Sequence, residues 1–229
     1  DLVALATICD VVPLKFLNRA FVSTGLKVMG WRQNYGLKAL FDLSNVREIP
    51  NEQNLGYIIG PRINAAGRLG NSNLGVELLC CNSEIEASEL ADKLNHLNEK
   101  RKDIQNKVLE SAIAKLDNID ISNKNVIILA DHEWHEGVIG IVAGRIKDRF
   151  HKPSIIISIN KDGIGKGSCR SVHSFDIGSA IIAAQQNGIL LSGGGHPMAA
   201  GLTVEKEKLK ELDKFLNERF LKSKKFFFR

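Results

Sequence analysis

The stretch NVIILADHEWHEGVIGIVAGRIKDRFHKPSIIISI, Asn125–Ile159, decides the fold, because it predicts a helix between two strands. Asn125–Ala130 and Pro153–Ile159 are short apolar runs of the length typical of buried strands. The segment between them, from about Val138 to Arg149, predicts a helix. Strands that alternate with helices indicate an α/β domain.

The same alternation continues toward the end of the chain. We expect a strand at Ile164–Val172, a helix at Asp176–Gln186, a glycine loop at Ser192–His196, a strand at Ala199–Val204 and an amphipathic helix at Lys206–Leu221. Together with the first stretch, these elements predict a mixed sheet with helices packed on it.

A long amphipathic helix is predicted before this α/β region. Ser83 and Glu86 have the spacing of a capping box at its start. A helix of more than about thirty residues reaches roughly 50 Å, a length typical of a segment that connects domains. We therefore place a domain boundary inside it, near residue 105. Its apolar stripe comprises Leu90, Leu94, Leu97, Ile104, Val108, Ala112 and Leu116.

The first eighty residues mix short apolar runs with polar turns. Asp1–Asp10 (DLVALATICD) predicts a buried strand, Asn18–Trp31 a helix, and Leu37–Leu43 a second, short helix. The stretch Gly60–Gly75 is rich in Gly, Pro and Asn, and we expect irregular structure there. The chain opens on Asp1 with no preceding loop or cap, so we expect it to be a fragment of a longer protein.

Composition places the chain among ordinary globular proteins. It has 229 residues, of which 44% are hydrophobic and 25% charged, so one large domain or two small ones can each bury a core. No apolar run approaches the roughly 20 residues that cross a bilayer. We expect a soluble, non-secreted protein.

The charge is mildly basic. Lys and Arg exceed Asp and Glu by 31 − 26 = 5, and the last twenty residues hold most of that excess. A basic balance fits a polyanionic partner such as nucleic acid, and it also occurs in enzymes without one. The four cysteines, Cys9, Cys80, Cys81 and Cys169, form no CxxC pair and no zinc-site spacing. We expect reduced thiols and a cytoplasmic location.

Asp10 is the first candidate functional residue. A carboxylate at the carboxyl end of a buried strand points into the crevice where α/β proteins bind ligands and metals. The alternative is an aspartate that caps the following turn. One carboxylate does not make a metal site.

The segment Pro61–Arg68 is the second candidate. Arg62, Asn64 and Arg68 stand among residues small enough for close backbone approach, which suits a phosphate clamp. The alternative is that both arginines pair with carboxylates of the long helix.

The segment DHEWHEG, Asp131–Gly137, follows a predicted strand. His132, His135 and Glu136 lack the HExxH spacing of a metal site. We favour instead an anion at the helix N-terminus beside His135. Trp134 has two readings, core packing or base stacking.

The segment GKGSCRS, Gly165–Ser171, predicts a strand with polar alternation. Period-two spacing puts Lys166, Ser168 and Arg170 on one face and Cys169 on the other, so a hydroxyl and a guanidinium could converge on one phosphate. The segment is not a P-loop, because GxxxxGK[ST] is absent.

The SGGGH segment adds Gly193, Gly194, Gly195 and His196. Glycines remove the side-chain barrier to an incoming phosphate or ribose, and His196 can donate a hydrogen bond. A bare turn is the alternative. Taken together, the arginine, serine and glycine segments indicate a site that binds the sugar-phosphate backbone of a nucleic acid.

Five blocks in order make this chain resemble the RecJ family of single-strand-specific exonucleases, within the DHH/DHHA1 phosphoesterase superfamily. They cover nearly the whole chain. The blocks are DLVALATICDVVPL (1–14), GPRINAAGRL (60–69), WHEGVIGIVAGR (134–145), GKGSCRS (165–171) and GGGHPMAAGLT (193–203).

The resemblance implies two α/β domains joined by a long helix, and two Mn²⁺ or Mg²⁺ ions that drive hydrolysis of single-stranded DNA from its 5′ end. It implies that Asp10 is a metal ligand, that Arg62 and Arg68 lie near the scissile phosphate, and that Ser168 and Arg170 hold the 5′-terminal phosphate. His196 and its glycine loop would bind substrate and contribute to catalysis.

The same resemblance divides the chain. Residues 1–82 would be the C-terminal part of a DHH domain, 83–117 the connecting helix, 118–221 the DHHA1 substrate-binding domain and 222–229 a basic tail. The family's upstream metal ligands, the Asp-x-Asp pair and the Asp-His-His triplet, are missing, as is its OB-type domain. We therefore expect the chain alone to be incomplete for catalysis.

Two other functions stay open. One is a DHH/DHHA1 oligoribonuclease or cyclic-dinucleotide phosphodiesterase, which shares the GGGH loop. The other is a non-catalytic module that binds single strands. The family resemblance also implies a role in DNA repair and recombination beside a helicase and a single-strand-binding protein, with no membrane partner.

Overall fold

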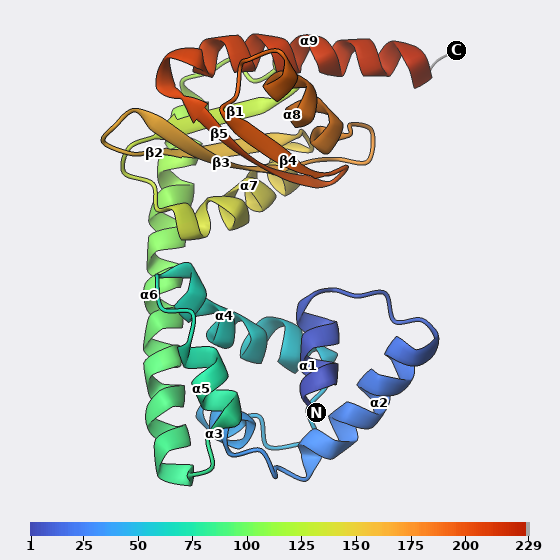
Figure 1. The fold of residues 1–229 in the computed structure, drawn as a ribbon, viewed down its shortest axis with the longest axis vertical. Coiled ribbons are helices and arrows are strands. Elements are labelled where there is room, and N and C mark those ends of the chain that lie inside the picture. The colour runs from blue at the N-terminus through green and yellow to red at the C-terminus, as the bar shows by residue number, and fades with distance from the viewer. Residues whose placement is uncertain (228–229) are drawn as a thin grey trace. The chain divides into compact units, whose positions relative to one another are not determined.

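The chain forms two compact units, each with its own core. The computed structural model describes residues 1–227 and divides them into an N-terminal unit, Asp1–Lys102, and a C-terminal unit that begins at Asp103 (Figure 1). Among the described residues, no helix combines the length and the apolar character that crossing a bilayer requires.

Helices make up the N-terminal unit. Its core consists of buried apolar side chains such as Leu37, Leu40, Phe41 and Leu55. The elements are α1 (Leu2–Cys9), α2 (Phe16–Gly30), α3 (Tyr35–Leu43), the π-helix η1 (Asn54–Ile59), α4 (Gly60–Arg68), α5 (Leu74–Cys80) and the first part of α6 (Glu84–Asp117).

The prediction of a strand at Asp1–Asp10 is wrong. Residues Leu2–Cys9 form α1, and the Asp1 carboxylate accepts a hydrogen bond from the Leu2 N–H at its N-terminus. A short apolar run suits a buried helix as well as a buried strand, because period cannot separate the two when all sides are apolar. Asp10 therefore lies at the C-cap of a helix and not at the end of a strand.

The prediction of irregular structure at Gly60–Gly75 holds for residues 69–73 and is wrong for the rest of the segment. Helix α4 covers Gly60–Arg68, and α5 begins at Leu74. Pro61 lies in the first turn of α4, where its missing N–H costs no hydrogen bond. Gly60 and Pro61 lie at the start of α4, and Gly70, with a φ of 97°, lies in the turn between α4 and α5.

The long helix is confirmed as α6, which has 34 residues. The Oγ of Ser83 accepts a hydrogen bond from the Glu86 N–H at 3.4 Å, as the capping box predicts. The apolar side chains along α6 pack in two cores. Leu90 and Leu94 belong to the N-terminal core, and Val108 and Ala112 belong to a core of the C-terminal unit.

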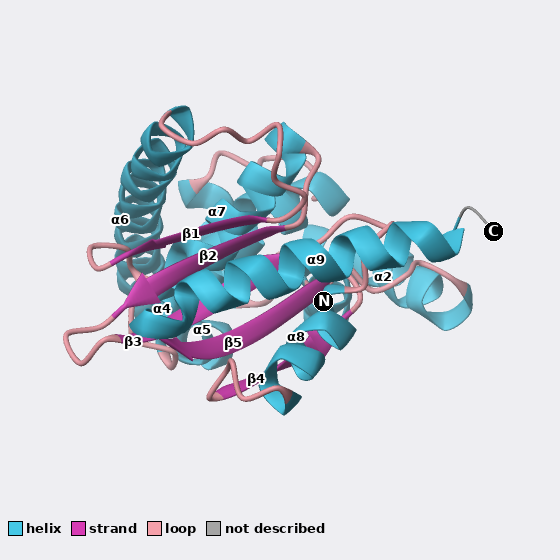
Figure 2. Cartoon of the chain, turned by 90° about the horizontal axis from the view of Figure 1, so that it is seen from above, coloured by secondary structure: helices cyan, strands magenta, loops and turns pink. Residues whose placement is uncertain are grey.

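The C-terminal unit contains a five-stranded mixed sheet in the order β1-β2-β3-β5-β4 (Figure 2). The β1–β2 pair is parallel and the other pairs are antiparallel. The mixed sheet with packed helices is confirmed. The strands are β1 (Ile127–Asp131), β2 (Ser154–Ile159), β3 (Ile164–Arg170), β4 (Ser192–His196) and β5 (Ala199–Glu205).

Helices cover both faces of this sheet. Helix α7 (Glu136–Phe150) and the end of α6 pack on one face, around Ile127, Leu129 and Ile156. On the opposite face, α8 (Ile177–Gln186) and α9 (Leu209–Phe227) pack around Ile155, Ile157 and Leu202 (Figure 1). The alternation of buried residues along β2 explains both cores, because successive side chains point to opposite faces.

Two predicted segments near the end of the chain differ in the structure. The predicted glycine loop Ser192–His196 is the edge strand β4, which pairs with β5 through a tight hairpin at Pro197 and Met198. Residues 206–208 form a 3-10 turn before α9. Residues 222–227 of the predicted basic tail continue α9, and 228–229 lie outside the described residues.

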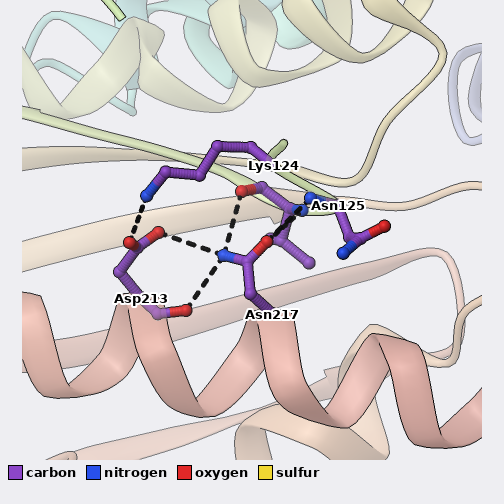
Figure 3. Close-up of polar contacts among 5 residues, drawn as sticks. Lys124, Asn125, Asp213 and Asn217 are labelled. Atoms are coloured by element: carbon purple, nitrogen blue, oxygen red, sulfur yellow. Dashed lines mark hydrogen bonds and ion pairs between the residues drawn. The ribbon is translucent and has the colours of Figure 1, made fainter. Parts of the chain in front are cut away.

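Asn217 ties α9 to the start of β1 (Figure 3). Its Oδ1 accepts hydrogen bonds from the backbone N–H groups of Asn125 at 2.7 Å and Val126 at 3.0 Å. Its amide nitrogen donates to the carbonyl of Val126 at 3.3 Å and to the carboxylate of Asp213 at 3.1 Å. Lys124 forms an ion pair with the same carboxylate. These contacts satisfy backbone groups that the edge strand would otherwise leave open.

Candidate nucleotide-binding site

Ser168 and Arg170 form a pair on β3. The Arg170 guanidinium donates to the Ser168 Oγ at 3.2 Å and to the Cys169 carbonyl at 2.8 Å. Cys169 points to the opposite face and is fully buried, and burial raises the pKa of its thiol to about 12. The predicted alternation along this strand is confirmed, and both polar groups of the pair are partly exposed.

Helix α7 crosses close above this pair because residue 140 is glycine. A Cβ at Gly140 would lie 2.9 Å from the Ser168 Oγ and 3.2 Å from an Arg170 nitrogen. A larger residue would therefore push the hydroxyl and the guanidinium out of position. Gly140 shapes the site although it offers no functional group of its own.

The first turn of α7 adds an ion pair beside β3. The Lys166 ammonium lies 2.9 Å from the Glu136 carboxylate, and both side chains are exposed. An exposed pair contributes little to stability. The pair places a carboxylate beside Lys166, whereas the two described hydrogen bonds of Arg170 go to neutral acceptors.

His135 is the N-cap of α7. Its Nδ1 accepts a hydrogen bond from the Gly137 N–H at 3.0 Å. The imidazole therefore occupies part of the helix N-terminus where we predicted an anion, and His135 is exposed. Trp134 is 4% exposed and donates to the Ser111 Oγ at 3.1 Å, so it packs in the core.

The glycines of β4 point in alternate directions. A Cβ at Gly193 would meet Ile181 of α8 at 2.6 Å, and one at Gly195 would meet the Ala199 carbonyl at 2.4 Å. A Cβ at Gly194 would meet nothing within 4 Å. His196 ends the strand and is exposed. Of the three glycines, only Gly194 has open space at the position where a Cβ would lie.

Arg62 contacts the long helix, but its two described hydrogen bonds go to neutral acceptors and not to the carboxylates of the predicted alternative. Its Nε donates to the Asn95 Oδ1 on α6 at 3.0 Å, and another nitrogen donates to the Ile58 carbonyl at 2.7 Å. These two bonds fix the guanidinium without a carboxylate partner. The pKa of Glu99, on the same helix, is lowered chiefly by its hydrogen bond with Lys102 and in smaller part by the charge of Arg62.

Asn64 and Arg68 are exposed on α4, one turn apart. Asp10 is exposed at the end of α1. Burial and, to a smaller extent, the charge of Asp10 raise the pKa of the neighbouring Cys9 thiol. These polar groups and Arg62 belong to the N-terminal unit, and the Ser168–Arg170 pair belongs to the C-terminal unit.

Asp10 does not complete a metal site with its neighbours. Within residues 1–227, no group of three or more His, Cys, Asp or Glu side chains is arranged to hold a metal ion. His132 lies 3.1 Å from the Lys206 ammonium, and His135 caps α7. The described residues therefore do not by themselves fit a centre of two metal ions, which needs several ligands.

Three residues shape the site in ways that the sequence did not predict. They are Glu136, which pairs with Lys166; Gly140, which admits α7; and Gly201, which lies beside Ser168 on β5. Strand register was the missing information for Gly201, because pairing across a sheet cannot be read from one strand.

Comparison with known proteins identifies relatives for this arrangement. Residues 123–222 match the DHHA1 domain family. "Single-stranded-DNA-specific exonuclease RecJ" of Haemophilus influenzae is 40% identical over 225 residues, which cover 95% of this chain and 39% of the relative. The chain thus spans about two fifths of that relative's length.

Solved structures give the same family. The crystal structure of RecJ from Thermus thermophilus in complex with Mg²⁺ matches with a TM-score of 0.85 and 31% identity, over 96% of this chain and 33% of that one. The structure of the same protein in complex with Mn²⁺ matches with a TM-score of 0.85 and 31% identity, over 96% of this chain and 32% of that one.

Proposed function

Because this chain belongs to the RecJ family and its residues 123–222 form a DHHA1 domain, we propose that it is part of an exonuclease that degrades single-stranded DNA from the 5′ end. Its relatives carry the name of a single-stranded-DNA-specific exonuclease. We assign the chain to DNA repair and recombination in the cytoplasm, beside a helicase and a single-strand-binding protein.

The proposal rests chiefly on the Ser168–Arg170 pair. A guanidinium fixed 3.2 Å from a hydroxyl offers several donors to one small anion, the arrangement that a terminal phosphate requires. We propose that this pair binds the 5′-terminal phosphate of the strand, with Lys166, His135 and the β4 residues Gly193, Gly194, Gly195 and His196 around the attached nucleotide.

For the N-terminal unit we propose that Arg62, Asn64 and Arg68 bind the DNA backbone near the scissile phosphate. Arg62 supports this role, because two hydrogen bonds to neutral acceptors fix the position of its guanidinium. Asp10 would supply one carboxylate ligand to a Mg²⁺ or Mn²⁺ centre. That centre would polarise the phosphodiester, and its other ligands would come from outside these residues.

We further propose the division into a DHH part (1–82), a connecting helix (83–117), a DHHA1 domain (118–221) and a terminal segment (222–229). Since the described residues supply no metal-ligand cluster, the 229 residues alone should bind single strands without cleaving them. Binding without cleavage is the second candidate function.

Binding of the 229-residue chain to DNA tests the proposal. Fluorescence anisotropy would compare labelled single strands that carry a 5′-phosphate with strands that carry a 5′-hydroxyl. Arg170→Ala should reduce the preference for the 5′-phosphate by at least about tenfold, because charge-assisted hydrogen bonds are lost. Arg149→Ala, which removes the same charge near the other end of α7, should leave the preference unchanged. An unchanged preference in Arg170→Ala would remove this residue from phosphate binding.

A further inference from the structure

Tyr57 is an exposed aromatic residue that the proposed DNA contacts do not include. Its side chain is 83% exposed, although tyrosine rings usually lie at least partly buried. Within residues 1–227, its hydroxyl has no hydrogen-bond partner and its ring forms no aromatic pair. The residue therefore contributes little to the core, and a flat face of its ring is open to a ligand.

The backbone that carries Tyr57 is the π-helix η1, a kind of turn that occurs frequently at functional sites. The Gly60 N–H donates to the Leu55 carbonyl, five residues earlier. A Cβ at Gly60 would lie 2.5 Å from the Cys9 Sγ, so the glycine lets this helix pack closely against the last turn of α1. Tyr57 thus belongs to an element that contacts the end of α1 where Asp10 is the C-cap.

The π-helix continues into α4 without a break, so residues 54–68 form one continuous helix. Tyr57, Asn64 and Arg68 are exposed along it, whereas Ile59 and Ala65 are buried. Positions seven and eleven residues apart return to nearly the same side of a helix, because they are separated by about two and three turns. The ring, the amide and the guanidinium therefore share one exposed side, over roughly 16 Å.

This side of the helix combines the groups that bind single strands. Proteins that bind single strands use positive charge to hold the backbone and aromatic rings on which bases stack. Arg68 supplies the charge, Asn64 a hydrogen-bonding amide and Tyr57 the ring. A span of roughly 16 Å covers about four to five nucleotides at the spacing of a stacked strand, roughly 3.4 Å.

Stacking on a side chain also distinguishes single strands from duplexes. In a duplex each base is paired and lies between its neighbours, so it reaches a protein side chain only when it is taken out of the stack. In a single strand an unpaired base can lie on an aromatic ring at lower cost. An exposed ring beside groups that bind the backbone thus favours the single strand.

We propose that Tyr57 stacks on a base of the DNA whose backbone passes Asn64 and Arg68, and that this contact contributes to the selection of single strands over duplexes. The inference rests on the proposed function and adds to it a residue that recognises a base and not a phosphate. The flat face of the ring carries the interaction, and the hydroxyl is not required.

Strands with and without bases separate stacking from backbone binding. Fluorescence anisotropy would measure the affinity of the 229-residue chain for a labelled oligothymidylate and for an abasic strand of the same length. Tyr57→Ala should weaken binding of the oligothymidylate about tenfold and leave that of the abasic strand unchanged. Tyr57→Phe should bind like the parent, whereas Tyr57→Leu, which lacks a flat ring, should resemble Tyr57→Ala. Equal loss for both strands, or no loss, would overturn the inference.

A hairpin duplex tests the selection between strands and duplexes. Its affinity should be the same for the parent and for Tyr57→Ala, because its bases are already stacked. The ratio of single-strand affinity to duplex affinity should therefore fall about tenfold in the variant. An unchanged ratio would remove Tyr57 from this selection.

A spectroscopic signal tests the stack directly. The fluorescence of 2-aminopurine is quenched when this base stacks, so a set of strands would carry it at one position each. The parent and Tyr57→Phe should quench the base that lies on the ring, and Tyr57→Ala should not. Quenching that survives at every position in Tyr57→Ala would overturn the assignment.

Two controls separate the possible failures. Trp31→Ala removes another exposed ring, 67% exposed at the C-cap of α2, and should leave both affinities unchanged. Arg68→Ala should weaken both strands, because it removes a charge that acts on the backbone. If Arg68→Ala has no effect while Tyr57→Ala weakens only the strand with bases, the backbone assignment fails and the stacking assignment stands; the opposite pattern reverses this conclusion. A parent chain that binds neither strand would refute both.

Discussion

Replacing Asn217 with alanine should destabilise the C-terminal unit by a predictable amount. The change removes the only acceptor that the described contacts give to the Asn125 and Val126 N–H groups, at 2.7 and 3.0 Å. Each partly buried N–H that loses its partner costs about 1 kcal/mol or more. Adding the lost bonds of the amide nitrogen, we expect a fall in the free energy of unfolding of about 2–4 kcal/mol.

Tryptophan fluorescence during urea unfolding can measure this change specifically for the C-terminal unit of the fold. Trp134 is 4% exposed and reports on the C-terminal unit, whereas Trp31 of the N-terminal unit is 67% exposed. A Trp31→Phe background leaves Trp134 as the sole tryptophan. In Asn217→Ala the urea concentration at the midpoint of unfolding should fall, and the dependence of the unfolding free energy on urea concentration should stay unchanged.

The neighbouring Glu218 supplies the control, because it is exposed on the same helix. Glu218→Ala should change the free energy of unfolding by less than about 0.5 kcal/mol. If the free energy of unfolding of Asn217→Ala also differs from that of the parent by less than about 0.5 kcal/mol, the contacts in Figure 3 do not stabilise β1 as we argue.

The remaining predictions concern single side chains. Gly140→Ala should keep or raise the melting temperature, because alanine favours a helix by about 1 kcal/mol over glycine, yet it should weaken phosphate binding by displacing Arg170; unchanged phosphate affinity would contradict the crowding argument. The backbone N–H of Ser179 is the main reason that the pKa of Asp176 lies below its ordinary value of 3.8, so the ionised cap contributes stability above that pH and loses it as the pH falls. Asp176→Ala should therefore cost about 1 kcal/mol at pH 7 and less at pH 3 in urea unfolding, and equal losses would refute the assignment. Cys169, with its pKa raised to about 12 by burial, should resist iodoacetamide at pH 8 until the protein is denatured, as mass spectrometry can show; labelling of the native protein would contradict its burial.

Elements with a clear period were predictable from the sequence. The apolar stripe through Leu94 and Ala112 predicted α6, and the apolar runs at 125–130 and 153–159 predicted β1 and β2. Alternation also placed Ser168 and Arg170 on one face, which the structure confirms. In each case local geometry alone decides which side chains share a surface.

Elements without a period were not predictable. The run Leu2–Cys9 is apolar except for Thr7 and folds as a helix, and Gly60–Arg68 is helical despite its glycines and proline. The glycines at Ser192–His196 have little strand propensity, and β5 makes them a strand by pairing with them.

The candidate site was predictable only in part for the same reason. Its charged groups appear in the sequence as motifs. By contrast, the position of Gly201 beside Ser168, and of Gly140 above it, depends on register and helix packing, which are properties of the tertiary structure.

The hydrogen bonds that Asn217 accepts from Asn125 and Val126 have a consequence for folding during synthesis of the chain. The residues that they join are separated by 91 and 92 positions in the chain. At a translation rate of about 5–20 residues per second, the interval between their appearances is on the order of 10 seconds. During that time the nascent β1 must satisfy its first N–H groups with water, while the β4–β5 hairpin can pair as soon as it leaves the ribosome. The final helix therefore completes the C-terminal unit as a late step of cotranslational folding.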